Sequence, residues 1–332
     1  MSVRLGLAGD VMLGRLVDAH QRERPPEAVW GSALELLREL DGLFVNLECT
    51  LSTRGTPWDR TYRPFHFRAD PAWAVPALEA AGVDGCSLAN NHVLDYGAVA
   101  LRDTLDALDD ADIAHAGAGR TREAAFEPAF VELEDLRVAV FAMTDNTPEY
   151  AADAASPGIA HVEIDVDSEE TRDAVRGALE RARAGDPDLV IASLHWGPNM
   201  VESPPDAFRD FGRWLVDAGV DVVWGHSAHV FHGVEVRDGA PIVYDAGDFV
   251  DDYRVDPRLR NDRSFLFDLS VADAGRPAEL RLHPTEIDDF AVHEAGPEAA
   301  AWSRERMQSR SEPFGTTFER EGSGLVLALP DE

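Results

Sequence analysis

Two patterns of apolar residues alternate along this chain. Continuous apolar runs typical of buried strands occur at residues 4–8, 43–45, 83–88, 137–143, 189–194, 220–224 and 264–271. Apolar residues with helical spacing occur between them, at residues 33–40, 98–108, 168–184 and 205–218. Pro205 suits the first turn of the last of these helices, and Gly219 suits its end. The alternation predicts an α/β protein.

A hairpin is predicted later in the chain, where strand-like residues 234–236 and 242–244 flank the turn signal Asp238-Gly239. Crossover units combined with late hairpins favour a layered αββα sandwich over a purely doubly wound sheet. We expect residues 1–272 to form this domain and residues 273–332 to form an extension that packs on the core or trails from it. After about residue 285 the composition fits either a helix and a peripheral strand or a partly ordered tail.

Five polar clusters follow predicted strands. They are Gly9-Asp10, Asn46-Leu47-Glu48, Asn90-Asn91-His92, His195-Trp196-Gly197 and Gly225-His226-Ser227-Ala228-His229. Sites in α/β proteins form in the crevice at the carboxyl ends of the strands, so these clusters can converge on one place. Carboxylate and amide oxygens together with neutral imidazoles are the ligands of a metal centre. The alternative is a purely structural role, in which Asp10 caps a turn or helix and Asn90 and Asn91 only form turns.

The ordered series of motifs resembles the CapA-type capsule or poly-gamma-glutamate biosynthesis family, which is similar in fold to the calcineurin-like metallophosphoesterases. The resemblance covers about residues 3–250 and rests on six segments: Gly9 to Arg15, Asn46 to Glu48, Asn90 to Gly97, His195 to Gly197, Gly225 to His229 and Tyr244 to Phe249. Two departures stand out. Ser227-Ala228 replaces the family's usual His-Pro, and Asp248 replaces its usual Asn.

The resemblance implies a role for each site residue. Glu48 stands where the metallophosphoesterase pattern places a bridging carboxylate. Asp10 and His229 would serve one metal ion, and Asn91, His195 and His226 the other. His92 would act as the acid that meets the leaving group or phosphoryl oxygen, so His92 and Asp10 are the catalytic candidates. The candidates for binding an anionic substrate are Arg15, Arg68 and Asn90.

The first of these metal sites is short of ligands. The metallophosphoesterase pattern begins Asp-x-His and ends Gly-His-x-His, whereas Met12 stands two residues after Asp10 and His226 and His229 are three apart. A single metal ion at Glu48, Asn91, His195 and His226, or a weak second site recruited by substrate, therefore fits the sequence as well as two permanent ions do. The mixed nitrogen and oxygen ligands suit manganese, iron or zinc without choosing between them.

Charge dominates the composition. Asp and Glu number 62 against 30 basic residues, all of them Arg, which gives a net charge of -32. Such a charge strains a compact fold by self-repulsion, which salt screens, so we expect a salt-adapted protein from a halophile. An acidic surface repels phosphate backbones and anionic lipids, which argues against nucleic acid and membrane partners. The acidic run Asp251-Asp252 is expected on the solvated surface.

Other features bound the location of the protein. The chain starts directly with a predicted strand and contains no stretch of about 18 apolar residues, so we expect a cytoplasmic protein without membrane insertion. The two cysteines, Cys49 and Cys86, are expected to be buried apolar residues rather than a disulfide or metal ligands.

The leading functional hypothesis is a metal-dependent hydrolase in which metal-bound hydroxide attacks a phosphoester or a related acyl or amide bond. Its partner would be a small anionic substrate or poly-gamma-glutamate. The alternative is a non-catalytic accessory protein in the synthesis or export of poly-gamma-glutamate, for which the weakened first metal site would be the mark.

Overall fold

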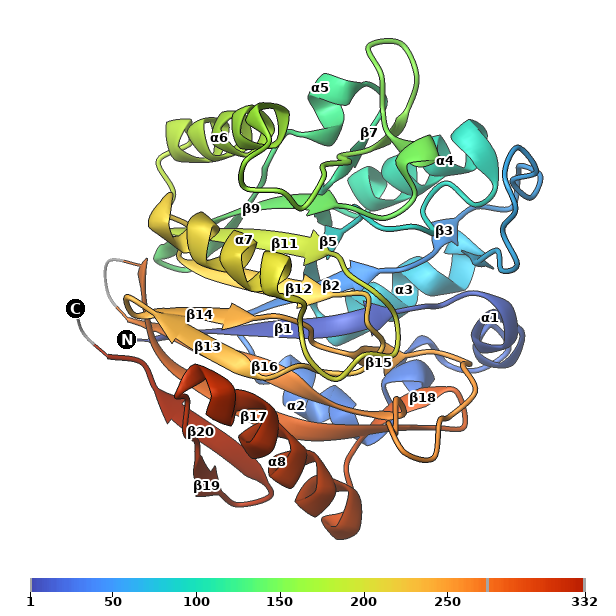
Figure 1. Cartoon of the computed structure of the whole chain (residues 1–332). Helices are drawn as coiled ribbons and strands as arrows, with labels where there is room; N and C mark the ends of the chain where they lie inside the picture. Colours follow the sequence, from blue (N-terminus) through green and yellow to red (C-terminus); the bar gives the residue numbers. More distant parts are fainter. Residues whose placement is uncertain (1, 273–274, 331–332) are drawn as a thin grey trace.

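The computed structural model describes residues 2–272 and 275–330, and two stacked β-sheets form its centre (Figure 1). The larger sheet has the strand order β19-β20-β17-β16-β1-β2-β5-β6, with β15 paired to β1 and β18 paired to β17. The bounds of these strands are β1 (Val3–Val11), β2 (Gly42–Leu47), β5 (Val83–Ser87), β6 (Ala114–Ala116), β15 (Asp248–Val250), β16 (Arg263–Ala272), β17 (Arg276–Asp288), β18 (Ala291–Glu294), β19 (Glu319–Glu321) and β20 (Gly324–Ala328).

The smaller sheet has the order β13-β14-β12-β11-β9-β8. Its strands are β8 (Ala129–Leu133), β9 (Leu136–Thr144), β11 (Leu189–His195), β12 (Val222–His226), β13 (Val234–Arg237) and β14 (Ala240–Val243). Short pairs are formed by β3 (Thr50–Leu51) with β4 (Arg68–Ala69) and by β7 (Ala118–Gly119) with β10 (Gly158–Ile159). The predicted hairpin is the turn between β13 and β14, where Asp238 and Gly239 both adopt the positive φ that a two-residue hairpin turn needs.

Helices cover the outer faces of both sheets, as Figure 1 shows. Helices α1 (Arg15–Gln21), α2 (Leu34–Arg38), α3 (Pro71–Ala81) and α4 (Gly97–Asp110) belong to the layer on the larger sheet, together with a 3₁₀ segment at Pro26–Ala33. Helices α6 (Glu169–Ala184) and α7 (Asp206–Asp217) cover the smaller sheet, and α5 (Arg122–Ala125) adds a short turn near them. Helix α8 (Pro297–Ser311) packs on β13, β16 and β17. The predicted αββα sandwich is confirmed.

Strand β11 shows how the layers are specified. All seven of its residues are buried, because one face meets the other sheet and the opposite face meets helices. Leu189 and Ile191 belong to the apolar cluster between the sheets, while Val190, Ala192 and Leu194 belong to the cluster under α6 and α7. A strand buried on both faces reads as a continuous apolar run, which is what residues 189–194 display.

The segment after residue 272 contributes strands to the larger sheet. Strand β17 pairs with β16 from Arg263–Glu286 to Ala272–Arg276, and its Leu280 and Leu282 are buried between the sheets. The expected domain boundary adjoins residues 273–274, which lie outside the described residues. The expected extension supplies α8, strand β20 and the edge strand β19. The 13-residue strand β17, which lies between β16 and β20, was missed because its polar residues alternate with apolar ones instead of forming a continuous apolar run.

Candidate metal centre

Both sheets direct polar residues to the same edge. Asp10 lies near the end of β1, Glu48 follows β2, and His195 and His226 are the last residues of β11 and β12. Register pairs Asp10 with Asn46 and His195 with His226. Because the parallel strands of both sheets end there, four motifs that are far apart in sequence meet in one place.

The glycines of two motifs allow this close approach. A Cβ atom on Gly9 would lie 1.8 Å from the carbonyl oxygen of Gly247, and one on Gly225 would lie 2.1 Å from the carbonyl oxygen of Tyr244. Both glycines directly precede a site residue. Only a residue without a side chain lets the neighbouring backbone pass there.

One group of potential ligands combines a carboxylate with two imidazoles. Asp10 Oδ1 lies 3.8 Å from Nδ1 of both His195 and His226, whose Nδ1 atoms are 2.9 Å apart. Asn91 Oδ1 lies 2.9 Å from the other ring nitrogen of His195, Nε2. Asp10, His195 and His226 have ligand atoms close enough to hold one metal ion.

A second group shares Asp10 and adds Glu48 and His229. His229 Nδ1 lies 3.4 Å from Asp10 Oδ2, and Glu48 Oε1 lies 3.8 Å from His195 Nε2. Ser227 and His229 have φ values of 111° and 61°, so the loop after β12 turns His229 back toward Asp10. The one-residue difference in spacing that weakened this site in the sequence is therefore absorbed by the backbone.

Buried carboxylate oxygens indicate that cations fit here. Asp10 Oδ2, Glu48 Oε1 and Asp248 Oδ2 are buried and have no hydrogen-bond partner among the described residues. A buried charge without a partner is costly, and buried anions are normally paired or bound to a metal. The donor set, with its nitrogen and oxygen ligands, suits a divalent metal ion.

The pKa values of the site follow from burial and from its own charges. Burial lowers the pKa of His195 well below its usual value and that of His226 to about 3, so both imidazoles are neutral and able to bind a metal. Burial, with a contribution from the charge of Asp10, raises the pKa of Glu48 well above its usual value. Burial opposes charge on His229 too, but Asp248 and Asp10 outweigh it and raise the pKa of His229. A bound cation would favour carboxylates and neutral imidazoles instead.

His92 is held by a carboxylate on its far side. Its Nδ1 lies 2.6 Å from Asp95 Oδ2, its Nε2 lies 3.9 Å from Glu48 Oε1, and its ring stacks on Phe67 at a centroid distance of 3.7 Å. Asp95 is fully buried and also accepts hydrogen bonds from the backbone N–H of Phe67 and the hydroxyl of Tyr150. Burial lowers the pKa of His92, and Asp95 partly offsets this. Asp95 lies in the segment Asn90 to Gly97 that carries the family resemblance, but no role was assigned to it from the sequence, although its i+3 spacing from His92 was a usable signal.

A cavity of about 630 Å³ opens over this centre. Asn91, His92 and His229 belong to its lining, together with the aromatic rings of Tyr62, Phe65, Phe67 and Tyr253. Tyr253 also donates a hydrogen bond from its hydroxyl to Glu48 Oε2 at 2.9 Å, which connects the cavity wall to the carboxylate below it.

Among the described residues that line this cavity, three are arginines, Arg15, Arg63 and Arg254, and none is an aspartate or glutamate. Arg15 is held by Asp252 at 3.3 Å and lies over the rings of Phe65 and Phe67. Arg63 donates hydrogen bonds to the carbonyl oxygen of Asn91 and to Thr147 Oγ1. In a chain with a net charge of -32, a cavity whose described lining combines three arginines with neutral groups is suited to an anion.

The other two substrate-binding candidates are placed elsewhere. The guanidinium of Arg68 lies over the ring of Tyr96, 4.1 Å from its centroid, and donates to the carbonyl oxygen of Arg54, outside the cavity lining among the described residues. Asn90 is fully buried: its amide nitrogen donates to Asn46 Oδ1 and the carbonyl oxygen of Leu47, and its amide oxygen accepts from the N–H groups of His92 and Val93. Asn90 thus shapes the loop that presents His92, and its side chain has no donor or acceptor left for a substrate.

The expectation that Asp251 and Asp252 lie on the solvated surface is wrong. Asp251 is 5% exposed, and the side chain of Asp252 has no exposed surface. Asp252 accepts from the backbone N–H of Leu16 as well as from Arg15. Two adjacent acidic residues do not reveal from the sequence that they are buried, because the groups that bind them, such as Arg15, come near only in the folded protein.

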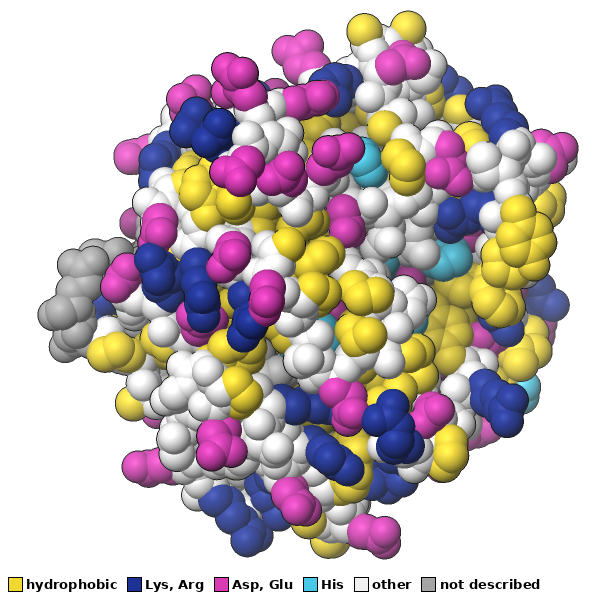
Figure 2. Space-filling model, in the orientation of Figure 1, with side chains coloured by type: hydrophobic (Ala, Val, Ile, Leu, Met, Phe, Trp, Pro, Cys, Tyr) yellow, Lys and Arg dark blue, Asp and Glu magenta, His cyan; other side chains and the backbone are white. Residues whose placement is uncertain are grey.

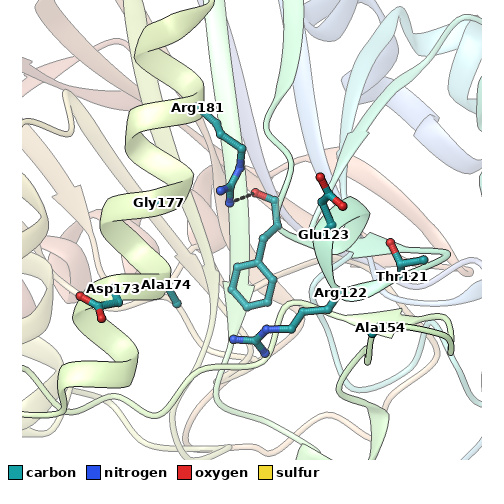
Figure 3. Close-up of a pocket in the computed structure, with 9 residues that line it drawn as sticks. Thr121, Arg122, Glu123, Ala154, Asp173, Ala174, Gly177 and Arg181 are labelled. Carbon is teal, nitrogen blue, oxygen red and sulfur yellow. Dashed lines mark hydrogen bonds between the residues drawn. The ribbon is translucent and has the colours of Figure 1, made fainter.

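The remaining surface differs from the cavity. Figure 2 shows acidic side chains interspersed with arginines over the face formed by α6 and α7. A second hollow of about 440 Å³ lies between α5 and α6 (Figure 3). There the guanidinium of Arg122 lies over the ring of Phe126, and Arg181 donates a hydrogen bond to the carbonyl oxygen of Phe126. Glu123 and Asp173 in the same lining offset these two guanidiniums, so no charge selection is built there.

Comparison with known proteins places the sequence in a family. Residues 4–253 match the family described as bacterial capsule synthesis protein PGA_cap. A probable polyglutamine synthesis accessory protein from Mycobacterium tuberculosis is 33% identical over 313 residues, which cover 91% of this chain and 81% of that protein. The capsule biosynthesis protein CapA of Bacillus anthracis is 28% identical, covering 74% of this chain and 59% of that protein.

A solved structure supports the fold alone. A hypothetical protein from Thermus thermophilus aligns with a TM-score of 0.50 and 17% sequence identity, covering 86% of this chain and all of that chain. Within residues 2–272 and 275–330, no helix combines the length and apolar character needed to cross a bilayer.

Proposed function

This chain belongs to the bacterial capsule synthesis protein family PGA_cap, and we propose that it is a metal-dependent hydrolase that cleaves a phosphoester or a related acyl or amide bond in an anionic substrate. One observation carries the proposal. Among the described residues, buried carboxylate oxygens without hydrogen-bond partners lie beside neutral imidazoles, next to a cavity whose lining includes three arginines and no aspartate or glutamate. A site suited to metal cations therefore lies next to a cavity suited to an anionic substrate.

Each part of the centre has a task in this proposal. Asp10, Asn91, His195 and His226 would hold one cation, and Asp10, Glu48 and His229 would hold a second. Cations bound there would polarise the scissile bond and acidify a water molecule at neutral pH. The buried position of the ligands, with Tyr253 closing over Glu48, keeps bulk water from competing for them.

His92 is placed to move a proton. Its Nδ1–H donates to Asp95, which fixes the ring and stabilises the imidazolium form. Nε2, which lies 3.9 Å from Glu48 Oε1, is then the atom that would give a proton to a leaving group. Burial lowers the pKa of His92 in the absence of substrate, and the negative charge of a bound anion would raise it. Arg15, at the cavity wall, would pair with the substrate's anionic group.

The test combines metal analysis with activity. Protein loaded with manganese should hydrolyse at least one activated phosphodiester, such as bis-p-nitrophenyl phosphate, and His92→Asn should slow turnover by about 10²- to 10⁴-fold without loss of metal. A fully metallated, folded protein that cleaves no member of a panel of phosphoesters and glutamyl amides would contradict the hydrolase.

The second candidate is a non-catalytic accessory protein of poly-gamma-glutamate synthesis. Two observations favour it: the Mycobacterium tuberculosis relative is called an accessory protein, and Met12 fills a position where metallophosphoesterases carry a ligand. The side chain of Met12 is fully buried, and its sulfur accepts a hydrogen bond from the N–H of Gly14. Binding of poly-gamma-glutamate by a catalytically inert, metallated protein would support this role.

A further inference from the structure

We propose that Asp248 is an additional ligand on the Glu48–His229 side of the centre. This side would then bind a cation mainly through carboxylate oxygens, while the other side binds one through two imidazoles together with Asp10 and Asn91. The inference rests on the proposed function only in requiring that the centre binds metal. Beyond the proposed function, it assigns one more ligand and predicts that the two sides of the centre prefer different kinds of metal ion.

Asp248 is brought to the centre by the sheet. Strand β15 runs parallel to β1, and their register pairs Asp10 with Asp248. The backbone N–H of Asp10 also donates to the carbonyl oxygen of Gly247 at 2.9 Å. The two carboxylates therefore project from adjacent strands at the same level of the sheet.

The contacts of Asp248 converge on His229. Asp248 Oδ1 lies 2.8 Å from His229 Nδ1, the same nitrogen that lies 3.4 Å from Asp10 Oδ2. The second oxygen of Asp248, Oδ2, is buried without a hydrogen-bond partner among the described residues, and the residue is 1% exposed. A cation between these groups would bind oxygens that the protein itself leaves unpaired.

The loop that carries His229 is fixed to the strand that carries Asp248. Asp245 accepts a hydrogen bond from the N–H of Ala228 at 2.7 Å and another from the N–H of Gly247 at 2.8 Å. Asp245 is fully buried, and these two bonds hold both ligands in register. Such support behind a site fixes the orientation of the groups that bind the metal.

The two halves of the centre then differ in chemistry. Glu48, Asp248 and Asp10 would supply carboxylate oxygens on one side, with His229 as the single imidazole. On the other side His195 and His226 supply two imidazoles. Carboxylate-rich sites suit manganese and magnesium, whereas imidazole suits zinc, copper and iron.

The experiment uses two metals in sequence on the chelator-stripped protein. One equivalent of Zn²⁺ is added first, and Mn²⁺ is then titrated while the electron paramagnetic resonance signal of free Mn²⁺ is followed. Wild-type protein should bind one further equivalent of Mn²⁺. Asp248→Asn should still bind the first Zn²⁺, but its Kd for Mn²⁺ should rise by at least about tenfold, since even outer-shell changes cost 10- to 100-fold.

Asp84→Asn is the matched control. Asp84 is also an acid of the larger sheet, but it lies at the start of β5, at the opposite end of the strands, where it accepts a hydrogen bond from the N–H of Leu43. The same loss of charge there should leave both metal affinities unchanged. Circular dichroism in the absence of metal checks the fold of each variant.

A second measurement does not depend on any variant. Electron spin echo modulation of Mn²⁺ in the zinc-first wild-type protein should report coupling to one imidazole nitrogen, that of His229. Coupling to two or more imidazoles, or an unchanged Mn²⁺ affinity in folded Asp248→Asn, would overturn the inference while leaving the hydrolase proposal standing. A wild-type protein that binds neither metal would overturn both.

Discussion

Replacing Asp95 with Asn removes a buried charge while keeping the shape of the side chain. In the native protein Asp95 Oδ2 lies 2.6 Å from His92 Nδ1 and 2.7 Å from the backbone nitrogen of Phe67, and Oδ1 lies 2.9 Å from the hydroxyl of Tyr150. An amide with its oxygen at the Oδ2 position keeps the first two bonds, and the Tyr150 hydroxyl can turn to accept the third. The perturbation is therefore mainly electrostatic.

The size of the effect follows from the charges. Two charges about 4 Å apart interact by about 4 kcal/mol at an effective dielectric constant of about 20. Each 1.36 kcal/mol changes a rate by about tenfold, so losing the support for the His92 imidazolium should slow turnover by roughly 10²- to 10³-fold. This lies inside the range expected for general acid catalysis. Weaker hydrogen bonds to the neutral amide should also lower the free energy of unfolding by about 1–3 kcal/mol.

The assay compares two leaving groups on the manganese-loaded protein. Because a general acid helps most when the leaving group is poor, Asp95→Asn should lose more activity against a phenyl phosphodiester than against its p-nitrophenyl analogue, with unchanged metal content. Asp84→Asn serves as the control. Rates within about twofold of wild type, or an equal loss for both substrates, would refute the role of the His92–Asp95 pair.

Three further predictions concern metal, salt and pH. His226→Ala or Glu48→Ala should each lower the metal content measured by elemental analysis after gel filtration, whereas His232→Ala should not; equal content in all three variants would contradict the ligand assignment. The melting temperature should rise steeply from dilute buffer to molar KCl, because salt screens the repulsion of a chain with a net charge of -32, and a flat or falling curve would rule out salt adaptation. Burial lowers the pKa of His232 to about 4, so between pH 6.5 and 4 the unfolded chain takes up a proton that the folded chain does not, and stability falls as the pH falls. The variant His232→Gln should keep a hydrogen-bond donor to the carbonyl oxygen of Val201. Between pH 6.5 and 4 its free energy of unfolding, measured in urea, should fall by about 1–3 kcal/mol less than that of the wild type. Parallel plots of unfolding free energy against pH for the two proteins would exclude His232 as a source of acid sensitivity.

Hydrophobic periodicity was sufficient for the layers of this fold. The runs at residues 189–194 and 220–224 became β11 and β12, and the helical pattern at 168–184 became α6, because strands covered on both faces and helices covered on one face leave different apolar spacings. Strand β17 escaped detection because only part of its surface is buried, so its apolar residues alternate with polar ones and form no continuous run. Its pairing with β16 also cannot be predicted from the sequence of the strand alone.

The candidate site divides in the same way. Asp10, Glu48, His195 and His226 could be selected from the sequence because each stands at a strand end, and strand ends converge whatever the loops do. The outlying residues could not. Arg68 carries the same charge as Arg15, yet its guanidinium lies over Tyr96, outside the cavity, while Arg63 and Arg254 line it.

The sequence by itself determined the order of strands and helices, the type of ligand available at each strand end and the acidity of the whole chain, because these depend on local spacing and composition. Only the tertiary structure decided that Asn90 is consumed by internal hydrogen bonds, that Asp95 supports His92, and that Asp248 meets His229 with an unpaired oxygen. These features depend on distances between residues that the chain keeps apart until β15 packs beside β1 and the two sheets stack. The role open to each side chain depends on which polar groups around it still lack a hydrogen-bond partner after folding.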